Sequence, residues 1–508
     1  MKAARIAILG AGIGGLSAAA LLAKRGYQVD IFERAAGPGG KMRQTQHGGL
    51  GVDAGPTVFT LRPIFEQLFA AAGGDFEALL KPERAEILAR HFWQDGPGLD
   101  LFADAGASEA AIGERFGQAN AAGFRRFSED AERCYRVLQK SYIEASRPTP
   151  FTLVKRIGPW RLGDLLATRP FTSLWRALGR YFPAPELQQL FGRYATYVGA
   201  SPFSAPATLM LIAHVEQLGV WTLPGGMVSL AEALKALAER NGATFHFNAE
   251  VEELTFAGGR PQGVRFKRQG AAENFPATHF LWGGDSAALN VGALGQEARR
   301  AVPPTPPAKR SLSALVWTGL IRRSAFPLSH HTVFFGPRYR DEFEAIFKRG
   351  ALPADPTVYL CAQDRSATGD NALPAGSGDP AFERVLCLTN APARGDQAPL
   401  SAAQERQAEA ALRSTLERCG MDDFHFEPDN LFLTTPEGFH NLFPHTGGAL
   451  YGRASHGWLA SFRRPGSRTA LPGLYLCGGS AHPGAGVPMA TLSGIQAAEA
   501  LCQDLTSA

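Results

Sequence analysis

Apolar and polar positions form distinct blocks at the beginning of this chain of 508 residues. Residues 6–9 are all apolar, which is typical of a strand buried on both faces of a parallel sheet. Small and apolar residues over 16–25 predict a helix that Gly26 ends, and residues 28–32 predict a second strand. The order strand, helix, strand is that of a βαβ unit and indicates an α/β fold.

The turn between the first strand and the helix is rich in glycine, with the sequence Gly10-Ala11-Gly12-Ile13-Gly14-Gly15. Gly10 allows a tight turn, Gly12 lets a pyrophosphate approach the backbone, and Gly15 lets the helix pack closely on the strand. The helix N-terminus then offers free N–H donors to the phosphates. Glu33 ends the second strand, 18 residues after Gly15, where it can accept hydrogen bonds from a ribose hydroxyl. Together these features predict a dinucleotide-binding site.

This turn alone does not distinguish NAD from FAD as the dinucleotide. The acid at the end of the second strand disfavours NADP, and the following Arg34 can meet the pyrophosphate of FAD. A second glycine-rich turn over 37–42 and the segment 53–57 come soon afterwards, which suits a long cofactor whose ribityl and flavin parts cross the domain. Two ordinary surface turns are the alternative. The residues predicted to line the flavin part are Gly40, Lys41, Met42, Gly55, Pro56 and Thr57.

Motifs at both ends and in the middle of the chain recur together in one protein family. The N-terminal motifs are the GAGIGGL turn, the ER-x4-GGK turn and the DAGPT segment. The C-terminal motif is HPGAGVP over 482–488, and the middle carries FGRYATYVG over 191–199 and a glycine turn at 225–226. In these motifs the chain resembles the FAD-dependent carotenoid desaturases of bacterial phytoene-desaturase type, within the flavin amine oxidase superfamily.

The resemblance implies a Rossmann-like FAD-binding domain of flavin amine oxidase type with an inserted α+β substrate domain. The FAD-binding domain is expected to be discontinuous, over residues 1–100, 221–300 and 430–508. The substrate domain, which is also expected to contact the membrane, takes residues 101–220 and 301–429.

The resemblance also implies cofactor contacts in the second half of the chain. The backbone of Val251 would meet the adenine, and the helix beginning near Pro488 would direct its positive end at the flavin pyrimidine. Met489 is either a flavin contact or a packing residue. The chain departs from the family pattern at Gly478-Gly479-Ser480, where flavoproteins usually carry an acid, and at Gly283-Gly284-Asp285. The contacts implied here are Val251, Asp285, Gly479, Val487, Pro488 and Met489.

The activity that the resemblance implies is the desaturation of a carotenoid, with hydride transfer from the polyene to the flavin N5. The long segment from Phe191 to Trp221 is most similar to the 1-hydroxycarotenoid 3,4-desaturase branch. Oxygen or a quinone would accept the electrons, and no catalytic acid or base is predicted. The alternatives are phytoene desaturase or another desaturase or isomerase of the family. An amine or protoporphyrinogen oxidase and a non-enzymatic prenyl-carrier escort protein are more distant alternatives.

Charge along the chain points to a membrane surface rather than to nucleic acid. The net charge is only +4, which gives no indication of nucleic-acid binding. Residues 151–193, however, carry seven basic and two acidic side chains interleaved with aromatic ones, a local excess of +5. This composition suits contact with anionic lipid, although an ordinary domain surface is the alternative. We expect a cytoplasmic protein attached peripherally to the inner or photosynthetic membrane. The uncharged stretch 194–215 is interrupted by glycine and proline, so it is not expected to span a bilayer.

Cysteine and histidine positions give no indication of a metal site or of disulfides. The six cysteines lie far apart, which indicates reduced and mostly buried thiols. His330 and His331 lack metal-ligand spacing, so we expect no metal to be bound. His214 and Glu216 could face the substrate passage, or they could be a core histidine and a surface glutamate.

Overall fold

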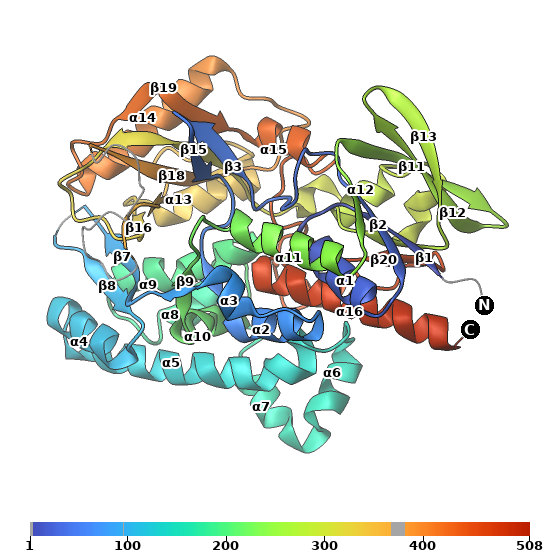
Figure 1. Cartoon of the computed structure of the whole chain (residues 1–508). Helices are drawn as coiled ribbons and strands as arrows, with labels where there is room; N and C mark the ends of the chain where they lie inside the picture. Colours follow the sequence, from blue (N-terminus) through green and yellow to red (C-terminus); the bar gives the residue numbers. More distant parts are fainter. Residues whose placement is uncertain (1–3, 95, 367–380, 508) are drawn as a thin grey trace.

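The computed structural model describes residues 4–94, 96–366 and 381–507, and a five-stranded parallel sheet lies on one side of it (Figure 1). The order is β10-β2-β1-β14-β20, and every neighbouring pair is parallel. The strands are β1 (Arg5–Leu9), β2 (Gln28–Phe32), β10 (Thr244–His246), β14 (His279–Trp282) and β20 (Leu474–Leu476). The apolar run in β1 is buried at the centre of the sheet, which confirms the strand expected there.

Helices cover one face of this sheet and a smaller sheet covers the other. The helices are α1 (Ile13–Lys24), α11 (Val228–Arg240) and α16 (Val487–Ser507), which share one apolar core with the strands. Small residues are needed where α16 crosses α1, because a Cβ on Gly494 would lie 2.1 Å from the carbonyl oxygen of Gly14. The antiparallel strands β11 (Ala249–Ala257), β12 (Arg260–Arg268) and β13 (Ala271–Pro276) pack on the opposite face.

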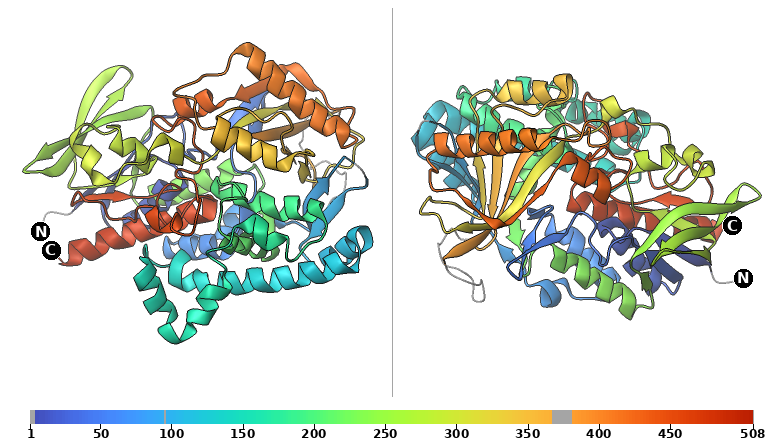
Figure 2. Two further views of the ribbon diagram at one scale, coloured as in Figure 1. Left: turned by 180° about the vertical axis from the view of Figure 1, so that it is seen from behind. Right: turned by 90° about the horizontal axis from the view of Figure 1, so that it is seen from above.

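A second, seven-stranded sheet forms the other half of the molecule. Its order is β19-β15-β18-β17-β16-β7-β8, with only the β16–β7 pair parallel. The strands are β7 (Ile87–Phe92), β8 (Leu99–Phe102), β15 (Ser313–Arg322), β16 (His331–Phe334), β17 (Val358–Ala362), β18 (Phe382–Ala391) and β19 (Phe426–Thr434). Helix α14 (Ala402–Arg418) packs on one face, as the right-hand view of Figure 2 shows.

A layer of helices lies under both sheets in the view of Figure 1. Its main members are α4 (Ala105–Phe116), α5 (Gln118–Leu138), α8 (Leu174–Leu178), α9 (Pro185–Gly192) and α10 (Leu211–Gln217), around an aromatic core. Two short helices, α6 (Pro150–Ile157) and α7 (Leu162–Ala167), project below this layer.

Short elements connect these layers. The helices are α2 (Arg62–Ala71), α3 (Phe76–Leu80), α12 (Ser286–Asn290), α13 (Tyr339–Glu344) and α15 (Pro436–Leu442). The strands are β3 (Gln44–His47), β4 (Leu50–Asp53), β5 (Phe59–Thr60), β6 (Glu83–Arg84) and β9 (Val220–Thr222).

Three of the expected domain boundaries fall inside strands: 100 in β8, 220 in β9 and 430 in β19. All five strands of the parallel sheet fall within 1–100, 221–300 and 430–508. Strand β7 pairs with β16 and β8 pairs with β7, so the segment 87–102 belongs to the seven-stranded sheet although the boundary was expected at 100. The division into domains stays a prediction.

The uncharged stretch 194–215 is not a continuous helix. It forms short 3-10 turns, η3 (Arg193–Val198) and η4 (Ala207–Met210), followed by the start of α10. Across residues 4–94, 96–366 and 381–507, every helix is too short or too polar to cross a bilayer.

Candidate functional site

One long cavity of about 930 Å³ connects the two halves of the molecule. One end lies at the glycine turn between β1 and α1, and the cavity passes the N-terminus of α16 and the inner face of the seven-stranded sheet. The other end lies among the helices α6, α7 and α10. A ligand much longer than a nucleotide can therefore lie in contact with the glycine turn and with the helical layer at once.

The residues expected from the sequence to contact a cofactor gather along this cavity, with one exception. Those that line it are Gly10, Gly12, Glu33, Arg34, Gly40, Lys41, Met42, Gly55, Pro56, Thr57, Val251, Asp285, Gly479, Val487, Pro488 and Met489. Gly15 packs inside the fold instead, because a Cβ there would lie 2.2 Å from the carbonyl oxygen of Gly10. This close approach is the helix–strand packing role expected for Gly15.

The glycine turn leaves open space where a phosphate group fits. A Cβ built on Gly12 would meet no atom within 4 Å, although Gly12 lies at the N-cap of α1. The carboxylate of Glu33 is buried and accepts hydrogen bonds from the backbone N–H groups of Ala11 and Ala35, each at 2.8 Å. A carboxylate keeps further lone pairs after two such bonds, so Glu33 can still accept a ribose hydroxyl. The residues present fit a dinucleotide.

Two cations line the middle of the cavity, of which Arg464 is buried and Lys41 is half-buried. Lys41 donates to the carbonyl of Leu450, and burial lowers its pKa while Asp285 raises it. Arg464 donates to the carbonyls of Gly479 and Tyr451, each at 3.0 Å, and burial likewise lowers its pKa. The sequence motifs gave no indication of Arg464. Positive charge at this point can stabilise an anionic part of a bound cofactor.

The first turn of α16 faces the cavity and is held in place by the residues before it. Val487, Pro488 and Met489 line the cavity, and Met489 also packs against apolar side chains of the helical layer, so both roles considered for it remain open. The Nε2 atom of His482 donates to the carbonyls of Tyr142 and Ala145, at 3.0 and 2.9 Å. Burial lowers the pKa of His482 to about 4, so the ring is neutral at pH 7.

The second half of the cavity is lined almost wholly by apolar side chains. They include Leu138, Ile143, Leu153, Val154, Leu162, Leu165, Leu166, Phe171, Leu209, Leu211, Ile212, Val215 and Phe462. Leu166, Phe171 and Trp458 line the cavity and are also exposed to solvent. The cavity therefore reaches the surface beside the projecting helices.

A small polar cluster interrupts this apolar lining. Arg193, Tyr197 and Glu216 line the cavity, and Glu216 accepts hydrogen bonds from the hydroxyls of Tyr194 and Tyr197, at 2.6 and 2.8 Å. Glu216 is only 5% exposed, so the alternative of a surface glutamate is wrong. His214 is half-buried, with its ring beside Tyr135.

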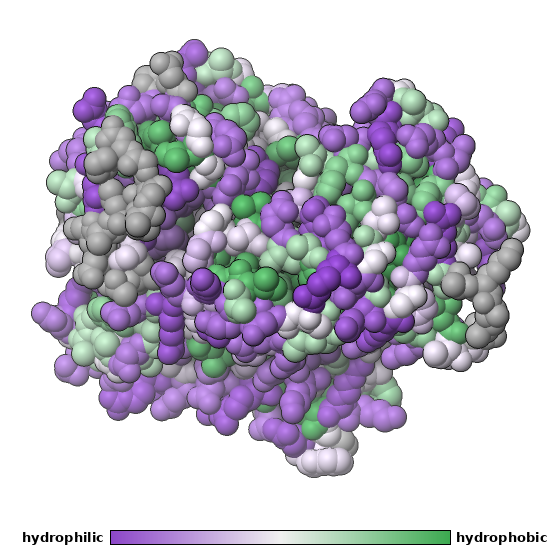
Figure 3. Space-filling view, in the orientation of Figure 1, coloured by the Kyte–Doolittle hydropathy of each residue, from purple (hydrophilic) through white to green (hydrophobic). Residues whose placement is uncertain are grey.

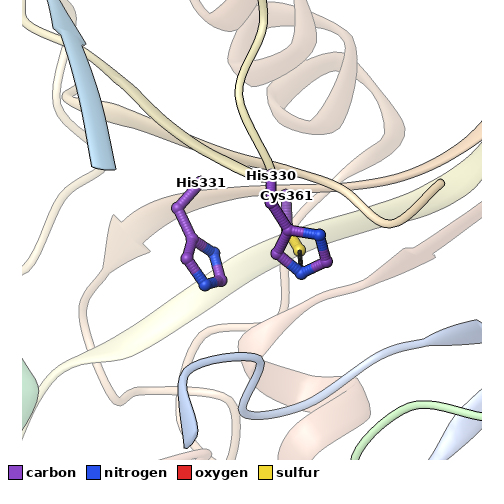
Figure 4. A group of neighbouring side chains, drawn as sticks. All are labelled: His330, His331 and Cys361. Atoms are coloured by element: carbon purple, nitrogen blue, oxygen red, sulfur yellow. Dashed lines mark hydrogen bonds between the residues drawn. The ribbon is translucent and has the colours of Figure 1, made fainter. Parts of the chain in front are cut away.

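Tyr359 of β17 joins the flavin turn predicted around Thr57 to a histidine pair. Its hydroxyl lies 2.6 Å from the hydroxyl oxygen of Thr57 and 2.8 Å from Nδ1 of His331. His330 and Cys361 lie next to His331, with 3.6 Å between Nε2 of His330 and the Cys361 sulfur (Figure 4). Two imidazoles and a thiol are possible metal ligands, although Nδ1 of His330 already bonds the backbone. The expectation that they bind no metal stays a prediction.

All six cysteines, which belong to the described residues, are unpaired, and five of them are buried. This confirms the expectation of buried thiols without disulfides.

Comparisons with known proteins identify the family. A family model described as NAD(P)-binding Rossmann-like domain matches residues 8–72, and one described as flavin containing amine oxidoreductase matches residues 350–502. A hydroxyneurosporene desaturase of Rubrivivax gelatinosus is 47% identical over 508 residues, which cover 100% of this chain and 95% of that protein. The chain belongs to the carotenoid desaturase family. FAD is the cofactor that membership of this flavoprotein family implies.

A second related sequence and a solved structure were also compared with this chain. A 1-hydroxycarotenoid 3,4-desaturase of a Flavobacterium species is 30% identical, with 96% of each chain covered. A solved structure of putrescine oxidase superimposes with a TM-score of 0.61 and 15% identity, covering 98% of this chain and 99% of that one. At that identity the likeness shows the fold of this desaturase family member, which is the flavin amine oxidase fold expected from the sequence.

Proposed function

We propose that the protein is an FAD-dependent desaturase that removes two hydrogens from a 1-hydroxycarotenoid at its 3,4 position. The observation that supports this most strongly is the continuous cavity, which is polar and glycine-lined at one end and apolar at the other. The printed functions of the similar proteins, a hydroxyneurosporene desaturase and a 1-hydroxycarotenoid 3,4-desaturase, agree with it.

In this proposal the cofactor is held by the residues predicted for it. The α1 N-terminus and the open space at Gly12 bind the pyrophosphate, Glu33 accepts from the ribose, and the backbone of Val251 contacts the adenine. The first turn of α16 contributes the positive end of its helix dipole near the flavin. Arg34 lies at the same end of the cavity and neutralises phosphate charge.

When bound, FAD supplies an acceptor for one hydride, while the second hydrogen leaves as a proton and the carbon–carbon single bond becomes a double bond. The chain's own residues position the polyene and exclude water, since the apolar lining offers few polar groups that would hold water there. Reoxidation of the reduced cofactor would need an acceptor of two electrons and two protons, either oxygen or a quinone.

The proposed route of the substrate begins at a membrane surface. Phe151 and Trp160, on the projection around α6 and α7, are 77% and 84% exposed. Lys155 and Arg161 lie exposed among them. Figure 3 shows this projection as mostly hydrophilic and near-neutral in colour, with a small hydrophobic area. Aromatic and basic side chains in this arrangement suit anionic lipid headgroups. Because the cavity reaches the surface here, a lipid-dissolved carotenoid could enter directly.

The test of this proposal is a substrate panel with the purified protein, FAD and liposomes. We expect bound FAD, and conversion of a 1-hydroxycarotenoid into a product with one more conjugated double bond. Turnover of phytoene without turnover of the hydroxylated substrate would assign the protein to another branch. Oxidation of putrescine alone would support an amine oxidase. Failure to bind FAD would favour an escort protein.

A further inference from the structure

The polar cluster in the apolar half of the cavity has unused hydrogen-bonding capacity. Arg193 is 6% exposed, and its Nε atom has no hydrogen-bond partner among the described residues. Its Nη1 atom donates to the Tyr197 hydroxyl at 3.0 Å. Glu216 accepts from Tyr194 and Tyr197, which leaves lone pairs on both carboxylate oxygens. Arg193 and Glu216 both line the cavity, so side chains with a spare donor and a spare acceptor lie in its wall.

Charge stays on Arg193 although it is buried. Burial alone lowers the pKa of Arg193, but Tyr197 and Glu216 raise it, and the net result is a pKa above its ordinary value. The guanidinium also lies over the Tyr197 ring, with 5.1 Å between the guanidinium carbon and the ring centroid. A buried guanidinium and a buried carboxylate both cost free energy to remove from water, so an unused donor on Arg193 is unusual in a side chain that serves packing alone.

This cluster lines the same cavity as the predicted flavin turn. Tyr359 bonds Thr57, and Tyr359 and Tyr197 both line the cavity and pack against the same hydrophobic core. Thr57 bonds Tyr359 and Tyr197 bonds Arg193, so one cavity wall carries both the flavin turn and the polar cluster. In a 1-hydroxycarotenoid only carbon 2 separates the hydroxyl-bearing carbon from carbon 3, where oxidation occurs. A group that recognises this hydroxyl must therefore lie next to the flavin.

We propose that Arg193, Tyr197 and Glu216 form a subsite that binds the tertiary hydroxyl of the substrate and sets the position of its 3,4 bond. Arg193 donates to the hydroxyl oxygen, and the hydroxyl donates to the Glu216 carboxylate. This inference rests on the proposed function, because it specifies which end of the carotenoid faces the flavin. A polyene without the hydroxyl displaces water but leaves the spare donor of Arg193 and the spare lone pairs of Glu216 unused, so the subsite disfavours it.

A comparison of matched substrates tests this subsite. The substrates are a 1-hydroxycarotenoid, its 1-methyl ether and the same polyene without oxygen. The variants are Arg193→Met and Glu216→Gln, and the quantity measured is the ratio of kcat/KM for the hydroxylated over the oxygen-free polyene. A hydrogen bond to a charged group contributes roughly tenfold to hundredfold in discrimination, so we expect the ratio to fall by about that factor in each variant. The methyl ether cannot donate and should lose the contribution of Glu216.

Tyr181→Phe is the matched control for Tyr197→Phe. Tyr181 is also buried and also donates to a carboxylate, that of Asp130, but neither residue lines the cavity. We expect Tyr197→Phe to lower the substrate ratio and Tyr181→Phe to leave it unchanged. An equal loss of kcat/KM for both substrates in the cluster variants would indicate a structural role only and would overturn the subsite.

Binding measurements separate this inference from the proposed reaction. Quenching of intrinsic fluorescence gives Kd for the hydroxylated and the oxygen-free polyene without turnover. The wild-type protein could desaturate no carotenoid and still bind the hydroxylated one with a lower Kd. If Arg193→Met removes this difference in Kd, the proposed reaction is refuted and the proposed subsite is supported. Desaturation with no hydroxyl preference in either Kd or kcat/KM would refute the subsite alone.

Discussion

Replacing Gly12 or Gly15 by alanine adds one methyl group to the turn. We expect the substitution at Gly12 to weaken FAD binding and the substitution at Gly15 to destabilise the fold. The two glycines lie three positions apart in the same turn, but their surroundings differ. A Cβ at Gly12 meets no atom within 4 Å, and the residue has a φ of −72°, which alanine adopts freely. A Cβ at Gly15 would lie 2.2 Å from the Gly10 carbonyl oxygen and 3.2 Å from a side-chain carbon of Ile8.

The expected magnitudes follow from these distances. An ordinary contact begins near 3.4 Å, so Gly15→Ala must move backbone atoms of the β1–α1 turn by more than 1 Å. Overpacking of this kind typically costs about 1–3 kcal/mol of the free energy of unfolding. We expect a cost of about 3 kcal/mol, because the atom in the way is a backbone oxygen that cannot rotate aside. Gly12→Ala should leave the free energy of unfolding of the FAD-free protein within about 1 kcal/mol of wild type. Its methyl group takes the space proposed for the pyrophosphate, so we expect Kd for FAD to rise roughly tenfold or more, which corresponds to about 1.4 kcal/mol.

Two measurements check this pair of variants. Urea unfolding of the FAD-free proteins gives the free energies, and titration with FAD by flavin fluorescence gives Kd. Wild-type affinity for FAD in Gly12→Ala would refute the placement of the pyrophosphate at this turn. Equal destabilisation of the FAD-free protein by both substitutions would refute the argument from the surrounding space.

Two other predictions concern acid stability and membrane contact. The folded-state pKa of His482 lies near 4, below its ordinary 6.5, so unfolding takes up a proton between these two pH values. The free energy of unfolding therefore falls as the pH falls from 6.5 to 4, by up to about 3 kcal/mol. His482→Gln should flatten the dependence of the unfolding free energy on pH, and an unchanged slope in urea titrations would contradict this. The double variant Phe151→Ser and Trp160→Ser should sediment with anionic vesicles at least about tenfold more weakly. Leu79→Ser, on the exposed face of α3, should not change sedimentation, and equal loss in both would exclude a specific docking surface.

Local sequence patterns predicted the parts of the fold that depend on neighbouring residues. The apolar run 6–9 marks a strand buried on both faces, and the small residues after it mark a helix whose backbone contacts α16. The pairing of β7 with β16 could not be predicted in this way, because about 240 residues separate the two strands and neither carries a distinctive motif.

The cofactor end of the cavity could be predicted and the substrate end could not. Glycines and Glu33 have chemical roles that their spacing indicates. Arg193, Glu216 and Tyr359 come from three separate elements, and their burial depends on packing between those elements. The long uncharged stretch around Glu216 was the one signal that could have drawn attention to a buried acid. Arg464 likewise gains its place through contacts with loop carbonyls far from the nucleotide motif.

Anaerobic mixing of the FAD-loaded protein with one equivalent of a 1-hydroxycarotenoid in liposomes tests the central claim most directly. The cavity joins its glycine-lined end and its apolar end in one continuous space. We therefore predict that the flavin absorbance bleaches in step with the appearance of a product that has one more conjugated double bond, one flavin for each double bond. Product formation with the flavin still oxidised, or no bleaching with bound substrate, would contradict the account.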